Sequence, residues 1–484
     1  MADVHADQDA LSRKEQSLYA DRVKVYPRKI EGNVRRIKWA VLIVLLGIYY
    51  IAPWLRWDRG PAAPDQAFLI DMPHRRAYFL WIEIWPQELY FLVGLLILGA
   101  LGMFFVTSLF GRIWCGYTCP QTVWTDLFMW VERLIEGDRN QRIRLDKAPM
   151  SVGKSGRKIA KHSAWMVIAA LTGGAWIMYF NDAMTVVPAI VTGQAGPAVY
   201  FFLGLFTFLT YLLAGWAREQ VCIYMCPWPR FQSAMYDEDT LIVTYRERRG
   251  EPRGKHRKGE TWEGRGHCVD CRHCVAVCPM GIDIRDGVQL ECIGCGLCID
   301  ACDKIMGKLD LPKGLIGYDS PGREAAIAAG QKPKHRFVRP RTIVYTIVFI
   351  LISAAMVWGL FSRTTVDVNV LHDRNPVFVT LSDGSVRNGY TIKVLNKTRE
   401  DRVYRLAFDG LDYAVMTVVG QEDSASRNVA RLTSIADSVT TYRVFLTTPP
   451  ELADFGQIDF DFVLTERETG EEARHSTVLR GPGS

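Results

Sequence analysis

Five long runs of apolar residues interrupt an otherwise polar chain. They contain 17 to 22 residues each and no charged side chain: Trp39–Leu55, Leu89–Phe110, Ala164–Phe180, Ala198–Ala217 and Ile343–Phe361. A helix needs roughly 20 apolar residues to cross the hydrocarbon core of a bilayer, with about 17 as the lower limit. One such run could be a helix buried in a soluble core, but five of them predict a multi-span α-helical membrane protein with five transmembrane helices. The shorter run Ala183–Val191 is expected to belong to an external loop.

Basic residues in the connecting segments predict the orientation of the spans. Residues 1–38 contain nine Lys and Arg and residues 111–163 contain ten, whereas residues 56–88 contain four and residues 181–197 none. Basic loops remain on the cytoplasmic side of a membrane. We therefore expect the N-terminus, the loop 111–163 and the segment 218–340 in the cytoplasm of a bacterium. With an odd number of spans across the inner (cytoplasmic) membrane, the tail, residues 362–484, is expected in the periplasm.

The tail has a different pattern of short alternating segments rich in Val, Thr, Tyr and Phe, separated by Asp-Gly, Asn-Gly and Pro-Pro. We predict strands at Val366–Val370, Val377–Leu381, Thr391–Leu395, Tyr404–Phe408, Thr441–Thr447 and Asp459–Leu464. This pattern is typical of an antiparallel β-sandwich of immunoglobulin-like type. The tail contains no cysteine, which excludes the inter-sheet disulfide common in such domains.

Composition agrees with a chain of several parts. The 484 residues are 49% hydrophobic and 23% charged, so the chain is neither fully embedded nor fully soluble. The net charge of +6 comes largely from the cytoplasmic flanks, and no nucleic-acid partner is needed to explain it. Residues 1–36 are expected to form a polar lead-in, residues 239–267 a flexible approach, and residues 303–340 a loop with one short helix.

Cysteine spacing carries the strongest chemical signal. All twelve cysteines lie in predicted membrane or cytoplasmic segments, which indicates metal or redox ligands rather than an external disulfide scaffold. Eight of them form a doubled C-x2-C-x2-C-x3-C motif: Cys268, Cys271, Cys274 and Cys278, followed by Cys292, Cys295, Cys298 and Cys302. This is the spacing of bacterial two-cluster ferredoxins, in which the fourth cysteine of each motif binds the other motif's cluster.

The motif therefore predicts two [4Fe-4S] clusters with crossed ligation. The first cluster is expected on Cys268, Cys271, Cys274 and Cys302, and the second on Cys292, Cys295, Cys298 and Cys278. Pro279 follows the first motif, whereas Asp303 stands where proline usually follows the second, and its negative charge should favour a lower potential. Zinc also binds C-x2-C pairs, but eight thiols in this doubled spacing favour iron–sulfur clusters.

The other four cysteines form two C-x3-C-P motifs, each at the predicted cytoplasmic end of a span: Cys115 and Cys119 before Pro120, and Cys222 and Cys226 before Pro227. Proline disfavours helix in the residue before it and suits the start of a new helix, and Gln121–Ile135 is amphipathic. Cys119 should then lie near a helix N-terminus, which favours thiolate. Soft thiolates suit copper(I) or zinc, or act as a dithiol/disulfide couple. The alternative is that these four thiols have only a structural role as small buried side chains.

Two kinds of redox protein are excluded by what the sequence lacks. Of the nine histidines only His162 lies near a span, so two histidine ligands for a membrane haem are not available. No G-x-G-x-x-G follows a strand, so no dinucleotide-binding fold is predicted.

These motifs together resemble the cytochrome c oxidase accessory protein family CcoG, also called FixG or RdxA. The resemblance covers the basic lead-in, five spans, WCGYTCPQ, CIYMCPW, the doubled ferredoxin motif and the external tail. NapH-like and NosR-like electron-transfer proteins share the membrane motifs, but the former lack the tail and the latter carry a flavin domain. The resemblance implies a cupric reductase that converts copper(II) to copper(I) during assembly of cbb3-type oxidase. Copper would be its substrate or a transient ligand, and assembly factors or a copper transporter or chaperone its partners.

The resulting hypothesis divides the chain into a cytoplasmic lead-in (1–36), a membrane domain with four helices and both C-x3-C-P motifs (37–238), a cytoplasmic ferredoxin-like domain (239–340), a fifth transmembrane helix (341–361) and a periplasmic immunoglobulin-like domain (362–484). In this hypothesis Cys115, Cys119, Cys222 and Cys226 form the catalytic copper or relay site. Two alternatives are an electron conduit between the quinone pool and a partner reductase, with structural thiols, and a membrane redox sensor. The electron donor is not identified by the sequence.

Overall fold

The computed structural model describes residues 24–61, 63–257, 259–332, 336–411, 413–420 and 428–483. The chain forms two compact units, one of residues 1–55 and 67–353 and the other of residues 56–66 and 354–484. Most of the predicted polar lead-in, residues 1–23, lies outside the described residues.

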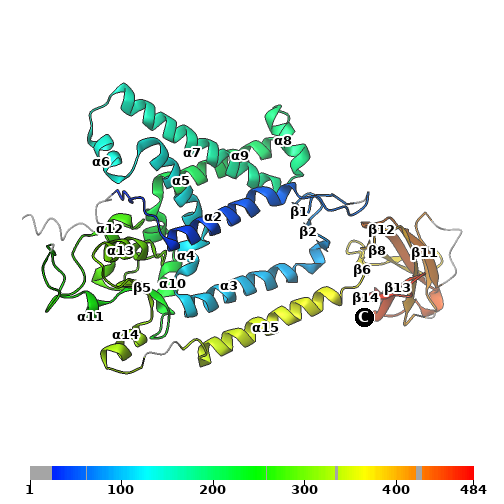
Figure 1. Ribbon diagram of the computed structural model, residues 1–484. Helices are drawn as coiled ribbons and strands as arrows, with labels where there is room; N and C mark the ends of the chain where they lie inside the picture. The colour runs from blue at the N-terminus through cyan, green and yellow to red at the C-terminus, as the bar shows by residue number, and fades with distance from the viewer. Residues whose placement is uncertain are drawn as a thin grey trace, which may run out of the picture. The chain divides into compact units, whose positions relative to one another are not determined.

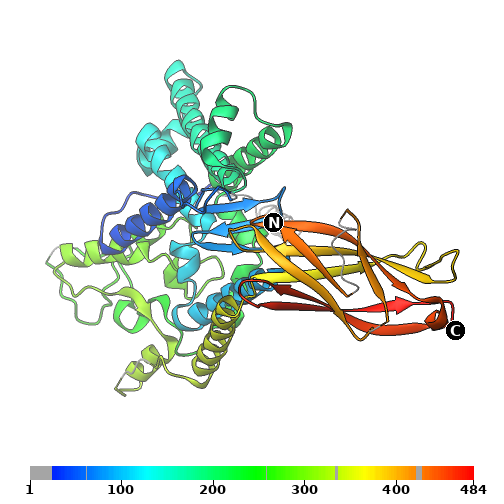
Figure 2. The same cartoon turned by 90° about the vertical axis from the view of Figure 1, so that its right-hand side faces the viewer.

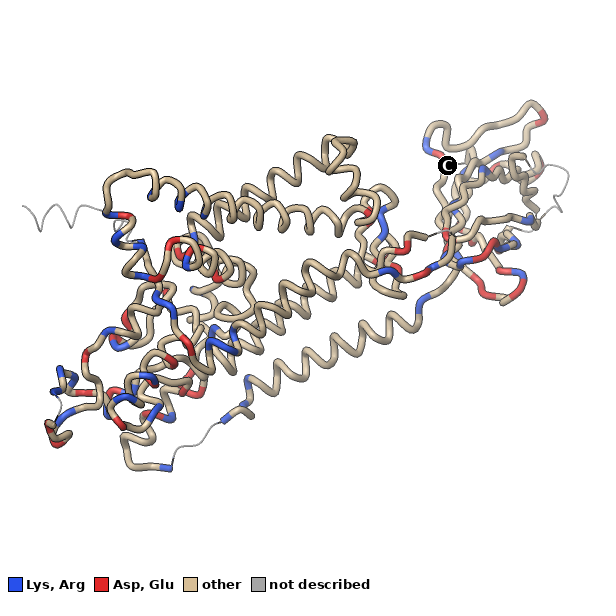
Figure 3. Tube along the Cα trace, turned by 45° about the horizontal axis from the view of Figure 1, so that its top comes forward, with Lys and Arg blue, Asp and Glu red and all other residues tan. Residues whose placement is uncertain are grey.

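Long apolar helices dominate the first unit (Figure 1). Within the described part of the chain, four helical stretches are long and apolar enough to cross a membrane: Asn33–Trp54, Pro86–Phe110, Pro197–Ala217 and Pro340–Phe361. They contain α2 (Asn33–Ile51), α3 (Tyr90–Phe110), α9 (Pro197–Thr210) with the π-helical segment η3 (Tyr211–Ala217), and α15 (Pro340–Phe361). In Figure 3 the charged residues of this unit gather away from the middles of these helices. Four of the five predicted spans therefore have the length and composition of membrane helices.

The remaining predicted span, 164–180, lies in α7 (Val152–Met178). This helix begins with the polar stretch VGKSGRKIAKHS, and its apolar half packs closely against α9. A side chain at Gly173 would lie 3.0 Å from the backbone nitrogen of Thr207, so the glycine permits this close approach. α7 has 27 residues and is long enough to cross a membrane, but it is not among the four helices that are also apolar enough, so its role as a span stays a prediction.

The cysteine-rich region is more regular than predicted. The flexible approach 239–267 contains β4 (Ile242–Tyr245) and α11 (Glu247–Gly250). The short helix predicted within 303–340 is present as α14 (Pro321–Ala328), but this segment also contains the end of α13 (Leu297–Lys308) and β5 (Ile316–Asp319). β4 and β5 pair antiparallel, with Val243 opposite Tyr318. The prediction was wrong here because each strand has only four residues and its partner lies about 70 positions away, so neither carries a local periodic signal.

Two further corrections concern the loops between the membrane helices. The segment 56–88 contains an antiparallel meander of β1 (Phe68–Asp71), β2 (Arg76–Phe79) and β3 (Ile82–Ile84), which was not predicted. Ala183–Val191, predicted as loop, forms the short helix α8, which Asp182 caps by accepting a hydrogen bond from the N–H of Thr185. Its apolar side contributes Ala183 and Val186 to a buried cluster, which stabilises the helix despite its length.

The second unit is the predicted β-sandwich (Figure 2). One antiparallel sheet has the order β10-β12-β8-β6, with β7 also paired to β8, and the other has the order β11-β9-β13-β14. The strands are β6 (Val366–His372), β7 (Val379–Thr380), β8 (Val386–Asn396), β9 (Arg402–Asp409), β10 (Val415–Val418), β11 (Val429–Ser434), β12 (Ser438–Thr448), β13 (Gln457–Glu466) and β14 (Glu472–Arg480). Side chains of both sheets, including Tyr390 and Phe462, form a single buried core. All six predicted strands are present, and β10, β11 and β14 were missed.

Candidate functional site

The first cysteine motif lines a small cavity. Its thiol-bearing residues are Cys268, Cys271, Cys274 and Cys302. Cys268 and Cys271 come from the loop that leads into α12 (His273–Val277), Cys274 from α12 itself, and Cys302 from α13. Asp270 and Arg272 have positive φ angles of 49° and 52°, which let the loop turn tightly around the cavity.

The second motif lines a neighbouring small cavity. Here the cysteines are Cys278, Cys292, Cys295 and Cys298, with Cys274 at the boundary to the first cavity. Gly294 and Gly296 have φ angles of 66° and 69°, conformations that glycine adopts without strain. Each cavity is thus lined by three cysteines of one motif and the fourth cysteine of the other.

The donor chemistry of both cavities fits iron–sulfur clusters. Four thiols on an otherwise largely apolar wall are the ligand set that such clusters use. A single zinc ion would require its sulfur ligands at about 2.3 Å from one point. Among the described residues no three His, Cys, Asp or Glu side chains gather closely enough to hold one ion.

Electrostatics differ between the two cavities. Burial raises the pKa of the Cys278 and Cys302 thiols to about 12, so a positively charged core is needed to stabilise their thiolates. The N–H groups of Met280 and Ile282 donate hydrogen bonds to Cys278 and oppose this rise in pKa. The wall of the first cavity also contains Arg285, which brings a positive charge. Asp303, which follows Cys302 in the chain, accepts a hydrogen bond from the N–H of Gly314 at 2.8 Å.

The two C-x3-C-P motifs lie beyond the spans rather than inside them. α3 ends at Phe110, Gly111 with a φ of 57° breaks the helix, and the separate helix α4 (Ile113–Tyr117) carries Cys115. Cys119 is the N-cap of α5 (Pro120–Glu136), as predicted. Cys222 lies in the π-helical segment η4 (Val221–Met225), and Cys226 follows as its C-cap.

The fold brings these four thiols into one neighbourhood. Burial raises the pKa of Cys115 to about 12, with further contributions from Cys119, Cys222 and Cys226. Burial, together with Cys119 and Cys226, likewise raises the pKa of Cys222 to about 12. The sulfur of Cys115 donates a hydrogen bond to Oε1 of Gln232, 3.2 Å away, on α10 (Trp228–Ala234).

The four-thiol group packs directly against the second cavity. Cys115 and Cys222 contact the same hydrophobic cluster as Cys278 and Cys295. Gly116 makes the closest approach, since a Cβ at this position would lie 2.9 Å from both Cα and N of Cys295. The first cavity, the second cavity and the four thiols therefore form a continuous series.

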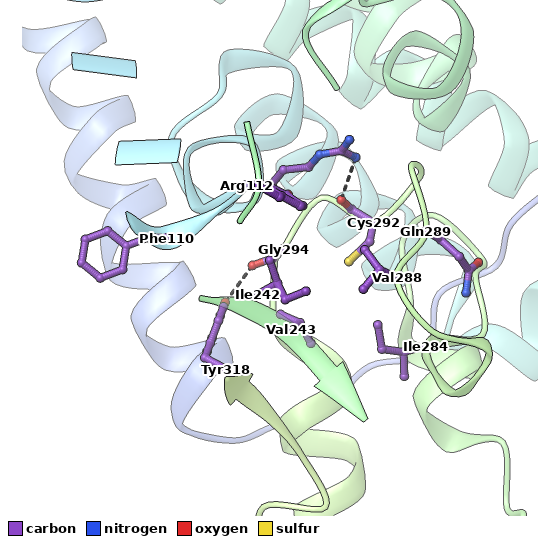
Figure 4. Close-up of a pocket in the computed structure, with 11 residues that line it drawn as sticks. Phe110, Arg112, Ile242, Val243, Ile284, Val288, Gln289, Cys292, Gly294 and Tyr318 are labelled. Carbon is purple, nitrogen blue, oxygen red and sulfur yellow. Dashed lines mark hydrogen bonds between the residues drawn. The ribbon is translucent and has the colours of Figure 1, made fainter. Parts of the chain in front are cut away.

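One arginine connects the end of α3 to the second motif, and sequence reasoning missed it. Arg112 is buried and donates hydrogen bonds to the carbonyl oxygens of Leu290, Pro229 and Cys292, the last at 3.1 Å (Figure 4). Tyr318 of β5 donates to the carbonyl oxygen of Gly294 at 2.7 Å in the same loop. A charged residue directly after an apolar span was the available signal, although its partners, more than 100 positions away, could not be predicted.

Comparison with known families agrees with this arrangement. A family model described as "4Fe-4S dicluster domain" matches residues 217–321, and one described as "4Fe-4S binding domain" matches residues 92–137. A third model, for the "IG-like fold at C-terminal of FixG", matches residues 356–482. The chain thus combines iron–sulfur domains, apolar helices of membrane-spanning length and an immunoglobulin-like tail.

Three curated relatives match almost from end to end. Nitrogen fixation protein FixG of Rhizobium meliloti (strain 1021) is 48% identical, over 96% of this chain and 94% of the relative. Proteins RdxA and RdxB of Cereibacter sphaeroides are 49% and 47% identical, over 89% and 97% of this chain and 91% and 98% of their own lengths. With this identity over nearly the whole length, the chain belongs to the FixG/RdxA family of iron–sulfur membrane redox proteins.

Proposed function

We propose that this chain is a cupric reductase that supplies copper(I) for the assembly of a cbb3-type cytochrome c oxidase. When bound, two [4Fe-4S] clusters would store and pass single electrons. The chain's own contribution is to hold the eight cysteines of the two cavities in crossed sets and to place Cys115, Cys119, Cys222 and Cys226 beside the second set. Copper(II) would be reduced at these four thiols, because soft sulfur ligands favour copper(I).

The contact of Gly116 with the backbone of Cys295 is the observation that carries this proposal. It leaves no intervening layer of protein between α4, which bears Cys115, and the loop that bears Cys295. Electron transfer to a metal ion on the thiols would therefore cross a short, packed path. Arg112 holds this loop by hydrogen bonds to the carbonyl oxygens of Leu290 and Cys292 and ties it to α10 by a third to that of Pro229, which keeps the path rigid.

Copper reduction by the purified protein tests the proposal. With the clusters chemically reduced under anaerobic conditions, addition of copper(II) should oxidise them and yield copper(I) in stoichiometric amount, detected with a copper(I)-specific chelator. The variant with serine at positions 115, 119, 222 and 226 should retain its iron and lose at least about tenfold in rate, since it lacks the soft ligands. Met225→Leu is the matched control, because it removes an exposed sulfur beside Cys226 without changing a thiol.

Two outcomes would contradict the proposal. If the serine variant kept its iron and reduced copper(II) at the wild-type rate, the four thiols would be structural. If reduced wild-type protein did not react with copper(II) at all, the cupric reductase function itself would be wrong.

A cavity among the membrane helices favours an electron conduit from the quinone pool as the second candidate function. It has a volume of about 930 Å³ and is lined mainly by apolar and aromatic side chains, among them Tyr49, Trp124 and Trp176. Pro120 and Gln121 form part of the wall, so the cavity adjoins Cys119. Reduction of the clusters by a short-chain quinol would support this candidate. The Trp124→Ala variant, which removes an aromatic contact from the wall of the cavity, should then retain its iron but lose this reduction.

A further inference from the structure

A second large cavity lies between the beginning of α2 and the end of α5, and it is strongly basic. Its volume is about 1070 Å³, and four cationic side chains line it: Lys29, Arg35, Arg36 and Arg133. Among the described residues of the lining Glu31 is the only carboxylate, and it is exposed and paired with Lys29 at 3.0 Å. The cavity therefore contains more positive than negative charge.

Two of these arginines, the buried Arg35 and the partly buried Arg133, have buried hydrogen-bond donors that are not used within the described chain. Arg35 is 5% exposed; its Nη1 donates to both oxygens of Asp126, at 2.9 and 2.7 Å, but its Nη2 has no partner among the described residues. Nε of Arg133 is likewise buried and unpaired within the described chain. Asp126 is also shared with Lys38 at 3.6 Å, so it does not neutralise the cavity. Buried donors without acceptors are costly, and a bound anion would satisfy them.

The pKa of Arg133 reflects the same imbalance. Burial, and after it the positive charge of Arg35, lowers this pKa to about 10. An anion between the two guanidinium groups would remove the repulsion that contributes to this shift.

Aromatic and aliphatic side chains around the cavity indicate which anion it would bind. Trp39 and Trp130 meet edge to face at 6.2 Å, and the guanidinium of Arg35 lies 4.6 Å from the Trp39 ring centre. Tryptophan prefers the level of lipid headgroups. Leu134 is 71% exposed beside the cavity, and Ile37 is exposed on the helix that begins there. Apolar contacts next to a group of arginine and lysine side chains suit a lipid better than a soluble anion.

We propose that this cavity binds the phosphate headgroup of an anionic phospholipid, with Arg35 and Arg133 as its phosphate ligands. Arginine is suited to this role because its charged N–H groups make strong hydrogen bonds to phosphate oxygens, and Nη2 of Arg35 and Nε of Arg133 are the donors that remain for them. Arg36 and Lys29 would interact with the phosphate from the open side. Basic pockets between membrane helices bind anionic headgroups in other proteins. Gly32, in the wall of the cavity, packs against Asp300 of α13, so the lipid would lie beside the point where the cysteine-rich region meets α2.

Lipid binding by the full-length protein in detergent tests the proposal. Native mass spectrometry should show one tightly retained phosphatidylglycerol, whereas phosphatidylcholine and inorganic phosphate should be retained weakly. Arg133→Gln should weaken phosphatidylglycerol binding about fivefold, the effect of one basic side chain near an anionic lipid surface. The matched control Arg157→Gln removes the same charge from an exposed position of α7 outside the cavity and should bind as the wild type does.

Arg36→Gln provides a second variant if Arg133→Gln lowers the iron content and so fails to fold. Arg36 is exposed, and its replacement should weaken binding without affecting the fold. Equal retention of phosphatidylglycerol by wild type, Arg36→Gln and a folded Arg133→Gln would overturn the proposal. Retention of phosphatidylcholine as tight as that of phosphatidylglycerol would also overturn it. Displacement of the lipid by an equal concentration of inorganic phosphate would assign the cavity to a soluble anion instead.

Discussion

Single residues hold the four-thiol group and the second cysteine motif together. Gly116 packs without a side chain against the backbone of Cys295 and Ile293. Arg112 donates hydrogen bonds to Leu290 and Cys292, which position the loop on the other side of this contact. Neither residue is a cysteine, and neither has a role that its immediate sequence neighbours reveal. Their positions become informative only when residues more than 170 positions apart are brought into contact.

Gly116→Ala should weaken retention of the cluster bound by the second motif. The new Cβ would lie 2.9 Å from backbone atoms, which cannot rotate away, so the loop must move. Overpacking of this kind typically costs about 1–3 kcal/mol. We expect faster release of iron to a chelator, followed by the loss of visible absorbance. Gly99→Ala in α3 is the control, because no atom lies within 4 Å of its Cβ; equal release rates for the two variants would contradict the prediction.

At the scale of elements, α13 sets the separation between the two cavities. Cys298 and Cys302 lie one helical turn apart, about 6 Å along the axis. Cys298 lines the second cavity, whereas Cys302 lines the first. α12 contributes in the same way, with Cys274 at the boundary and Cys278 in the second cavity. Two short helices thus place cysteines of each motif next to those of the other.

Cys302→Ala should damage the cluster held by Cys268, Cys271 and Cys274 and spare the other. The iron content should fall from about eight to about four atoms per chain, because only the first cavity loses a ligand. Electron paramagnetic resonance of the reduced protein should lose the signal of one cluster. Cys298→Ala is the reciprocal variant and should remove the other signal. If Cys302→Ala instead damaged the cluster of Cys292, Cys295 and Cys298, the crossed ligation would be wrong.

For the whole molecule, the prediction that matters most is the side of the membrane on which each part lies. The basic residues of segments 1–38 and 111–163 indicate that the cysteine-rich region is cytoplasmic and the tail periplasmic. Alkaline phosphatase is active only after export. A fusion after Ser362 should therefore be active and a fusion after Asp310 inactive, with equal amounts of both proteins on an immunoblot. The reverse activities would contradict the topology and would move copper reduction to the other compartment.

The sequence by itself determined the parts whose signal is local. An apolar run of membrane length, a repeated cysteine spacing and an alternating strand each depend on residues within about 20 positions of one another. These features predicted four of the membrane-length helices, the cysteine motifs, α5 with Cys119 at its N-terminus, and the sandwich in the tail. They also carried the resemblance to the family to which the chain belongs.

The tertiary structure alone decided how these parts meet. The pairing of β4 with β5, the hydrogen bonds of Arg112 and the contact between Gly116 and Cys295 join positions 70 or more residues apart. The basic cavity around Arg133 likewise combines residues of α2 and α5 that are about 100 positions apart. Such contacts leave no periodic pattern, because each depends on the packing of whole helices rather than on the spacing of side chains along one of them.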